Sequence, residues 1–283
     1  MKRIAIQGIK GSFHDMAAHQ YFKDENLEML YCSTFDSLFA TLEEDNATIG
    51  VMAIENTIAG TLLHNYELLR DSGCTIIGEY KLHIEHSLMC LPEDSIEDIN
   101  EVNSHPVALA QCRNFLATHP SFKAVVAEDT AGAAAIISQK KLRGHAAICH
   151  EGAAPLYGMK VLKRAIEDNK HNFTRFLILS TPHNATQVRN VEQTNKSSLV
   201  FSLSHEEGSL AKALSVFSSF HINLTKIQSL PIIGKEWEYL FYVDLTYGNY
   251  ARYRQSINTI KPLTKELTIL GEYLEYKNKP QLT

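Results

Sequence analysis

The first 181 residues repeat one pattern, in which an apolar strand is followed by a polar loop and a helical segment. Such strands are RIAIQG (3–8), TIGVMAI (48–54), FKAVVAE (122–128) and HAAICH (145–150). Strands that alternate with helices predict an α/β fold with largely parallel strand pairing. The longer run TIIGEYKLHIEHSLMCL (75–91) is expected to carry the chain between two subdomains.

A different order follows residues 182–196, which are polar and lack periodicity and are therefore expected to form a linker. The sequence then predicts a strand (198–204), a helix (209–220), two strands (224–230 and 238–246), a helix (250–260) and a strand (267–276). The order βαββαβ is that of the ferredoxin-like fold. We therefore expect two domains of different architecture, at 1–181 and 197–283.

Composition excludes several classes of protein. The chain has 283 residues and a net charge of −5, whereas nucleic-acid binders are usually basic. No apolar run reaches the length of a membrane span, and the amino terminus lacks the features of a signal peptide. The five cysteines are scattered, which fits free thiols in a reducing cytoplasm. The histidines form no metal-binding motif, so we expect no metal.

Polar residues follow two of the predicted strands, at the edge where α/β folds bind ligands. Ser12 and Asp15 have the spacing of a capping box at a helix start, where unpaired N–H groups also favour an anion. Asn56 and Thr57 are neutral polar groups at the end of the next strand. A structural cap and turn chemistry explain these residues nearly as well, so both interpretations stay open.

A further polar pair lies in SHPVALAQC (104–112). Pro106 favours the first turn of a helix, which predicts Ser104 as the N-cap. Gln111 lies two helical turns further along the same face. Taken alone, this stretch is better explained as a capped helix than as a site.

The stretch HNFTRFLILS (171–180) places polar side chains at the start of a buried strand. Strand alternation puts Thr174 and Phe176 on one face and Arg175 on the other, although twist or bulging near the beginning of the strand can bring both into one cleft. Arginine suits a carboxylate because its guanidinium group can make two parallel hydrogen bonds. A salt bridge at the start of the strand is the alternative interpretation of Arg175.

Four stretches, in this order and spacing, resemble the prephenate dehydratase family: GIKGSF (8–13), AIENTIAG (53–60), SHPVALAQC and HNFTRF (171–176). The second domain, with EEGSLAKAL (206–214) and INLTKIQSLP (222–231), resembles the ACT regulatory domain of that family. The resemblance covers nearly the whole chain. Because no chorismate mutase segment precedes Met1, the chain resembles the monofunctional form of the family.

The resemblance implies a catalytic domain of two α/β subdomains, like type II periplasmic binding proteins, with the active site in the cleft. It implies conversion of prephenate to phenylpyruvate, CO2 and water in phenylalanine biosynthesis, without a cofactor. Thr174 is expected to donate a proton or hydrogen bond to the departing hydroxyl, Arg175 to bind a carboxylate, and Phe176 to shape the ring pocket. The implied substrate-binding residues are Ser12, Asn56, Thr57, Ser104, Gln111 and Asn172.

The resemblance also implies a phenylalanine site between paired ACT domains, and hence a homodimer or homotetramer. The implied effector-binding residues are Gly208, Ser209, Leu210, Asn223, Leu224, Gln228 and Ser229. Where the family usually has Glu-Ser-Arg-Pro, this chain has Gln-Ser-Leu-Pro at 228–231. Loss of a carboxylate near an amino-acid ammonium group is expected to weaken or retune the binding of phenylalanine.

Two alternatives are compatible with the sequence. An arogenate dehydratase would carry out the same reaction on the aminated substrate. A non-enzymatic amino-acid sensor would combine a binding cleft with an ACT domain, although it would not need both Thr174 and Arg175. The role of Glu55, as a proton relay or as a structural group, is also open.

Overall fold

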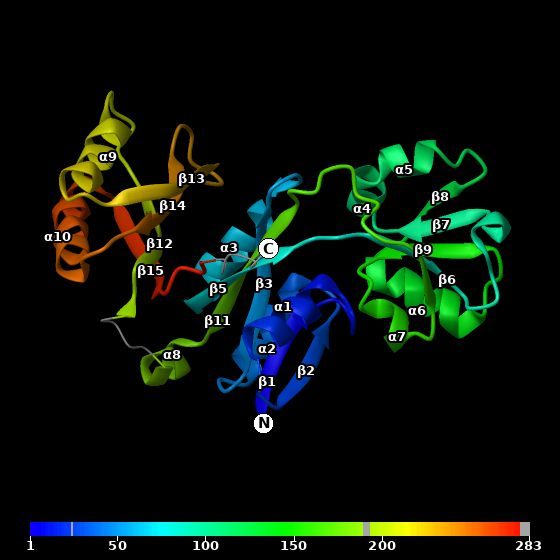
Figure 1. Cartoon of the computed structure of the whole chain (residues 1–283). Coiled ribbons are helices and arrows are strands. Elements are labelled where there is room, and N and C mark those ends of the chain that lie inside the picture. The colour runs from blue at the N-terminus through cyan, green and yellow to red at the C-terminus, as the bar shows by residue number, and fades with distance from the viewer. Residues whose placement is uncertain (24, 189–192, 278–283) are drawn as a thin grey trace. The chain divides into compact units, whose positions relative to one another are not determined.

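The computed structural model describes residues 1–23, 25–188 and 193–277. The chain divides into two compact units (Figure 1). The first unit is formed by Met1–Leu68 and Tyr80–Leu177, and the second by Leu69–Glu79 and Ile178–Thr283. The division therefore differs from the predicted domain boundary at 181, because a short segment from the first half of the sequence belongs to the second unit.

The first lobe is built on strands in the order β5-β11-β3-β1-β2, of which β5 and β11 each have residues in both units. Its elements are β1 (Lys2–Gln7), α1 (Phe13–Tyr21), β2 (Leu27–Cys32), α2 (Phe35–Glu44), β3 (Ile49–Asn56), β4 (Gly60–Thr61), α3 (Leu63–Asp71), β5 (Thr75–His83) and β11 (Phe173–Ser180). Strand β1 pairs in parallel with both β2 and β3, as predicted. The apolar residues of β3 are buried throughout, which is typical of a strand covered on both faces.

The second lobe has a sheet with the strand order β10-β6-β9-β7-β8. Its elements are β6 (Ser87–Cys90), a 3-10 helix (Ile96–Asp98), β7 (Glu101–Ser104), α4 (Pro106–Gln111), α5 (Arg113–Ala117), β8 (Lys123–Val126), α6 (Thr130–Lys140), β9 (His145–Cys149), α7 (Ala153–Leu156) and β10 (Lys160–Lys163). Strand β7 is parallel to β8 and β9, as predicted. Strand β6 pairs antiparallel with β9 and β10, so the prediction of parallel pairing fails at this side of the sheet.

Two segments connect the lobes. The predicted crossover at 75–91 is confirmed, because β5 belongs to the first sheet and β6 to the second. The chain returns through 164–172, between β10 and β11. The segments run together, since Ile84 N donates to Asn172 O at 2.8 Å and Ile166 N donates to His86 O at 2.9 Å. Two α/β lobes joined in this way confirm the predicted architecture.

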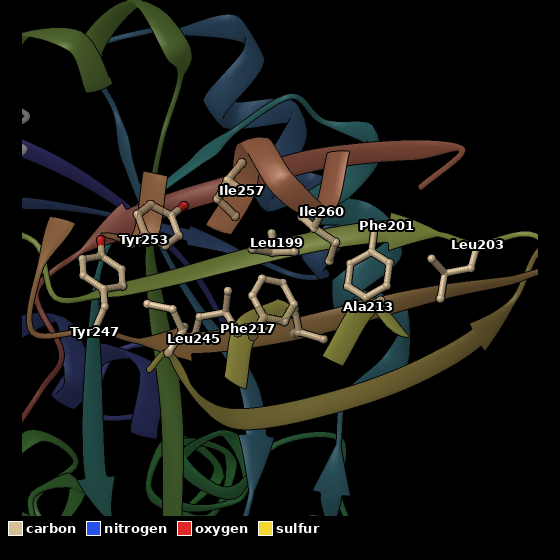
Figure 2. Close-up of a cluster of buried hydrophobic side chains, with 12 residues drawn as sticks. Leu199, Phe201, Leu203, Ala213, Phe217, Leu245, Tyr247, Tyr253, Ile257 and Ile260 are labelled. Carbon is tan, nitrogen blue, oxygen red and sulfur yellow. The ribbon is translucent and has the colours of Figure 1, made fainter. Parts of the chain in front are cut away.

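The second unit contains the predicted βαββαβ order. Its elements are β12 (Lys196–Ser202), α9 (Ser209–Ser219), β13 (Asn223–Pro231), β14 (Tyr239–Thr246), α10 (Tyr250–Ile260), a 3-10 helix (Lys261–Leu263) and β15 (Glu266–Tyr273). The strands are ordered β13-β14-β12-β15, with every neighbouring pair antiparallel. Alternate residues of β12 and β14, such as Leu199 and Val243, pack in one core with Phe217 of α9 and Ile257 of α10 (Figure 2). Both helices therefore cover the same face of the sheet.

The predicted linker at 182–196 is not irregular throughout. Helix α8 (Pro182–Val188) occupies its beginning, and β12 begins at its last residue, Lys196. Residues 189–192, and the last six residues of the second predicted domain, lie outside the described part of the chain. The helix shows no apolar periodicity in the sequence, but its first residue is a proline, which is favoured at that position.

A buried ion pair attaches the segment Leu69–Glu79 to the rest of the second unit. Lys196 Nζ lies 2.9 Å from both carboxylate oxygens of Glu79, and both side chains are almost fully buried. Tyr276 N donates to the same carboxylate at 3.1 Å. Because breaking a buried pair would leave an uncompensated charge, this contact explains why the segment is part of the second unit. Among the helices in the described ranges, none is long and apolar enough to cross a bilayer.

Gly271 provides a test of how β15 meets this segment. Gly271 is the residue of β15 that pairs with Ile76, and a Cβ atom added to it would lie 2.3 Å from the Ile76 carbonyl oxygen. We expect Gly271→Ala to lower the free energy of unfolding by about 3 kcal/mol, because the two backbones must separate. Urea denaturation followed by circular dichroism measures this change.

Gly248→Ala is the matched control, since nothing lies within 4 Å of its added Cβ. It should change the free energy of unfolding by no more than about 0.5 kcal/mol. Equal stability of the two variants would contradict the close approach at Gly271.

Candidate active site

The candidate site is organised around a hydrogen bond between two asparagines. Asn56 ends β3, and Asn172 lies on the returning connection between the lobes, where it is fully buried. Asn56 Nδ2 donates to Asn172 Oδ1 at 2.8 Å and to Thr174 Oγ1 at 2.9 Å, with Phe173 O at 3.2 Å. The structure therefore brings together three of the predicted site residues.

The orientation of the Asn56 carboxamide is set by the backbone. Asn56 Oδ1 accepts from Ile58 N at 2.9 Å and from Ala59 N at 2.8 Å. A backbone N–H can only donate, so the oxygen of the carboxamide must face these two groups. The turn chemistry and the ligand-binding role that the sequence left as alternatives are therefore two functions of one side chain, with Oδ1 holding the turn and Nδ2 facing the site residues.

The same hydrogen-bond chain continues to the second lobe. Asn172 Nδ2 donates to Gln111 Oε1 at 3.0 Å, and His86 Nε2 lies 2.9 Å from the same oxygen. Gln111 is the last residue of α4 and is only 8% exposed. The sequence singled out Gln111 and Asn172, and the structure joins them through a direct side-chain contact.

Thr174 is left with a proton to donate. Its hydroxyl oxygen accepts from Asn56 Nδ2, and the described part of the chain provides no acceptor for the hydroxyl proton. The side chain is half-buried at the beginning of β11. A ligand at this position would therefore receive a hydrogen bond from Thr174, which is the geometry that the predicted role requires.

Arg175 forms the salt bridge that the sequence left as an alternative. Its Nη1 lies 3.2 Å from Glu55 Oε1, and the residue is 8% exposed. Glu55 is therefore a partner of the guanidinium group, which supports the structural alternative for this residue. This contact engages at least one of the five N–H donors of the guanidinium group.

Phe176 does not take the predicted position beside a ligand. It is 1% exposed and packs in the first lobe, with its ring 5.0 Å from that of His14, centroid to centroid. Phe176 shares the buried part of β11, whereas Thr174 lies where the strand begins. The structure therefore assigns Phe176 to the core behind the site, where it holds the strand in place.

Ser104 also differs from its prediction. It is the last residue of β7 and is fully buried, and its hydroxyl donates to Ile148 O at 2.5 Å. The N-cap of α4 is His105, whose ring accepts from Val107 N. The prediction of Ser104 as the cap was wrong, because Ser104 ends β7, a strand that the sequence had not indicated, and the N-cap lies one residue later.

Ser12 is the N-cap of α1, as predicted. Its hydroxyl accepts from Asp15 N at 3.3 Å, while the Asp15 carboxylate accepts from Gly11 N at 2.8 Å instead of completing the box with Ser12. The next residue, Phe13, contacts the His86 ring edge-on at a centroid distance of 5.6 Å. The start of α1 therefore lies beside the end of the hydrogen-bond chain.

Thr57 has a different part in the site. Its hydroxyl donates to His171 O at 3.1 Å and accepts from Phe173 N at 2.9 Å. Thr57 N donates to Phe173 O at 2.9 Å. The Thr57 hydroxyl thus donates one hydrogen bond to the backbone and accepts another from it. These bonds connect the turn after β3 to the segment that carries Asn172.

Sequence reasoning missed His86. It was considered only as a metal ligand, whereas its contacts are Gln111, Phe13 and the Glu167 carboxylate, which accepts from His86 N at 2.8 Å. Burial lowers the pKa of His86, against the opposite effects of Gln111 and Glu167. Its partners lie far away in the sequence, so local spacing carried no signal. In the described residues no group of three or more His, Cys, Asp or Glu side chains is placed to hold a metal.

The Glu167 carboxyl next to His86 is held in its charged form. Burial raises its pKa, but the Lys170 ammonium group and the His86 N–H outweigh burial, and the pKa lies below its ordinary value. Lys170 Nζ lies 2.8 Å from Glu167 Oε1. This carboxylate therefore acts as a fixed acceptor that positions the backbone of His86.

The predicted effector residues fall into two groups in the second unit. Gly208, Ser209 and Leu210 form the start of α9, beside a cavity of about 120 Å³. The cavity is lined by Leu203, Ser204, His205, Glu206, Ser209, Leu210, Trp237, Tyr239 and Phe241. In β13, Ser229 pairs with Phe241 at the cavity end and Gln228 with Tyr242.

Asn223 and Leu224 belong to the opposite end of β13, where they pair with Thr246 and Leu245. Leu224 packs against the core of the unit. Within one chain, these two residues therefore do not join the group at the start of α9.

Comparison with known proteins assigns the family. Residues 4–184 match the family model described as prephenate dehydratase. The chain belongs to this family. The family is one of carbon–oxygen lyases, so the chain is an enzyme rather than a sensor that only binds.

Curated relatives extend over most of the chain. Arogenate dehydratase 2 of Petunia hybrida is 36% identical over 286 residues, covering 96% of this chain and 71% of the relative. The bifunctional chorismate mutase/prephenate dehydratase of Aquifex aeolicus is 36% identical over 275 residues, covering 96% of this chain and 73% of the relative.

Three solved structures are similar over nearly the whole chain. Prephenate dehydratase of Staphylococcus aureus matches with a TM-score of 0.81 and 28% identity, over 96% of this chain and 99% of that one. GqqA, described as a novel type of quorum-quenching acylase, matches with a TM-score of 0.84 and 28% identity, over 97% and 98%. Prephenate dehydratase of Arthrobacter aurescens in complex with L-Phe has a TM-score of 0.84 and 24% identity, over 99% and 92%, which shows a common fold.

His14 makes the stability of the first lobe depend on pH. Burial lowers its pKa from 6.5 to about 4, and its Nε2 accepts from Ala53 N at 3.2 Å, which requires the neutral ring. Below pH 6.5 the unfolded chain binds this proton and the folded chain does not. The stabilisation is therefore complete above pH 6.5 and is lost as the pH falls through about 4, with a size on the order of 3 kcal/mol.

Urea denaturation at several pH values between 7 and 4 measures this loss. His14→Gln is the control, because its carboxamide oxygen can accept from Ala53 N but does not titrate. The variant should lose less stability than the wild type over this range. Parallel curves for the two proteins would show that His14 does not cause the dependence.

Proposed function

We propose that this protein converts prephenate to phenylpyruvate, CO2 and water. The observation that carries the proposal is the direction of the hydrogen-bond chain around Asn56. In this chain the side-chain oxygens of Asn172, Gln111 and Thr174 all accept hydrogen bonds from the protein. The Thr174 hydroxyl and the Gln111 amino group therefore remain as donors. A substrate with two carboxylates and a departing hydroxyl matches such a set of donors, with Arg175 beside it.

The reaction needs little covalent help from the protein. The bond between the ring and its carboxylate breaks, and its electron pair enters the ring as CO2 leaves. The ring C–O bond breaks, and the departing hydroxide takes up one proton from the solvent to form water. Because the ring becomes aromatic, the driving force is built into the substrate. The protein must place the substrate and stabilise the charge that develops on the leaving oxygen.

Thr174 is proposed to stabilise this leaving oxygen. Asn56 Nδ2 donates to Thr174 Oγ1, so the lone pair of the hydroxyl is engaged and its O–H can be directed at the substrate. A threonine hydroxyl is a weak acid, so we assign it a hydrogen bond rather than full proton transfer. Arg175, the next residue of β11, is proposed to bind a substrate carboxylate, because a guanidinium group can make two parallel hydrogen bonds to a carboxylate.

An arogenate dehydratase is the second candidate, since the relative from Petunia hybrida carries that name. Arogenate has an ammonium group where prephenate has a keto group, and the reacting ring is the same. The two substrates are distinguished by comparing kcat/KM for each with the same preparation.

The likeness to GqqA supports an acylase less well than a dehydratase. Acyl transfer by a side chain requires a nucleophile activated by an adjacent base. The hydroxyls of Thr57 and Ser104 are bonded to backbone groups, and that of Thr174 to the Asn56 amide. Among the described residues, none of these three hydroxyls is hydrogen-bonded to an imidazole ring or to a carboxylate.

The role of Thr174 is tested by two substitutions. Thr174→Val keeps the shape of the side chain and removes the hydroxyl, and should lower kcat by about 10²–10³ with little change in KM. Thr174→Ser keeps the hydroxyl and should retain most of the turnover. Phenylpyruvate is followed by the absorbance of its enolate in alkali. A folded wild-type protein without turnover of prephenate or arogenate would refute the proposed function, and unchanged turnover in Thr174→Val would refute the role of Thr174.

We extend the proposal to regulation by L-phenylalanine at the second unit. The support is the cavity at the start of α9, which contains two predicted effector residues, Ser209 and Leu210, and three aromatic side chains. Helix α9 has Gly208 as its N-cap, without a side-chain cap, and Ser209 N donates to Glu206 O; the next N–H groups of the first turn can therefore receive a carboxylate. The relative from Arthrobacter aurescens was solved with L-Phe. A homodimer or homotetramer in the cytoplasm, where the five buried thiols would stay reduced, belongs to the same proposal.

The only tryptophan of the chain reports on this cavity. Trp237 lines it and is 67% exposed, so an amino acid bound there should change its fluorescence. We expect a saturable change with L-phenylalanine, accompanied by lower dehydratase turnover, and neither with D-phenylalanine. Ser209→Phe should abolish both responses by filling the cavity. Ser219→Phe, at the other end of α9, is the control. Binding unaltered in Ser209→Phe would place the effector elsewhere.

A further inference from the structure

The protonation of every group in the hydrogen-bond chain follows from the turn after β3. Asn56 Oδ1 faces two backbone N–H groups, so Nδ2 must face Asn172. The Asn172 atom that receives this hydrogen bond must be its oxygen, and its amino group therefore faces Gln111. Gln111 in turn must present Oε1 at this contact.

The state of His86 is then determined. Its Nε2 lies 2.9 Å from Gln111 Oε1, which can only accept, so Nε2 must carry a proton. The pKa of His86 is lowered by burial, which makes the ring neutral, and Nδ1 therefore carries a lone pair. The tautomer of His86 is thus set by backbone groups at Ile58 and Ala59, in the other lobe.

This tautomer leaves one polar atom unsatisfied. His86 is 2% exposed, and its Nδ1 is buried without a hydrogen-bond partner among the described residues. A buried acceptor without a partner destabilises a fold, and such a group calls for a reason. The ring is nevertheless held firmly, by Phe13 against its edge and by Glu167 at its backbone N–H.

We propose that His86 is a positioning residue for the reaction, which holds the Gln111 carboxamide so that its amino group faces the substrate. The inference rests on the proposed function. Gln111 Oε1 receives hydrogen bonds from both His86 and Asn172, and two donors on one oxygen fix the plane and the direction of the amide. Gln111 Nε2 is then turned away from both, and it has no acceptor among the described residues. His86 acts on the substrate only through Gln111.

The tautomer is tested first, because it can be measured without substrate. Nitrogen NMR of ¹⁵N-histidine-labelled protein should show His86 protonated at Nε2 and unprotonated at Nδ1 near neutral pH. In Asn172→Asp, the introduced carboxylate can only accept, so Gln111 must turn its amino group toward that carboxylate and toward His86. The proton of His86 should then move to Nδ1. An Nδ1-protonated ring in the wild type, or an Nε2-protonated ring in Asn172→Asp, would overturn the proposal.

Kinetics test the consequence for catalysis. His86→Leu removes the donor and should lower kcat/KM for prephenate roughly tenfold, the size expected for one lost hydrogen bond. His86→Gln can place an N–H near the position of Nε2 and should recover most of the loss. Circular dichroism and urea denaturation establish that both variants are folded.

Equal losses in the two folded variants would show that His86 serves packing alone and would overturn the proposal, as would unchanged kinetics in His86→Leu. If the wild type turns over neither prephenate nor arogenate, the proposed function fails. The NMR result then still decides whether the hydrogen-bond chain has the inferred direction.

Discussion

Two backbone N–H groups, those of Ile58 and Ala59, determine the orientation of the Asn56 carboxamide, and the polar site depends on that contact. A carboxamide without fixed partners can present either its oxygen or its amino group to a ligand. Here the turn after β3 fixes the orientation when the protein folds. The orientation of Asn56 then determines that of Asn172, and Asn172 determines that of Gln111. Each carboxamide donates to the oxygen of the next, from the first lobe to the second.

The fold makes this chain possible because both connections between the lobes contribute to it. Asn172 lies on the returning segment, and His86 on the outgoing one. The hydrogen bond from Ile84 N to Asn172 O joins the two segments. It holds the backbone that carries Asn172 beside the backbone that leads to His86. Thr57 adds the turn after β3 to the same group through its bonds to residues 171 and 173. The site residues are therefore positioned by backbone pairing rather than by flexible loops.

Much of the fold could be predicted from the sequence, because periodicity is a local property. The βαββαβ order of the second unit and the crossover at 75–91 are of this kind. The antiparallel placement of β6 is not, since strand direction depends on partners that lie elsewhere in the chain. In the site, polarity at the end of a strand pointed to Asn56, whereas only the resemblance to the family pointed to Gln111; Phe176, which the resemblance placed at the ring pocket, belongs to the core. The residues that accept from Asn56 Nδ2 are more than a hundred residues away, and no local pattern records them.

The charges around the site support a mechanism based on placement. Two carboxylates next to the chain have a cationic partner, since Glu55 faces Arg175 and Glu167 faces Lys170. Glu167 is not suited to act as a general acid, because its pKa lies below the ordinary value and the carboxyl group stays ionised. A reaction that forms an aromatic ring supplies its own driving force and needs chiefly a fixed donor at the leaving oxygen. A neutral donor of set direction, the role proposed for Thr174, would meet that need without a group that must change its protonation state in each cycle.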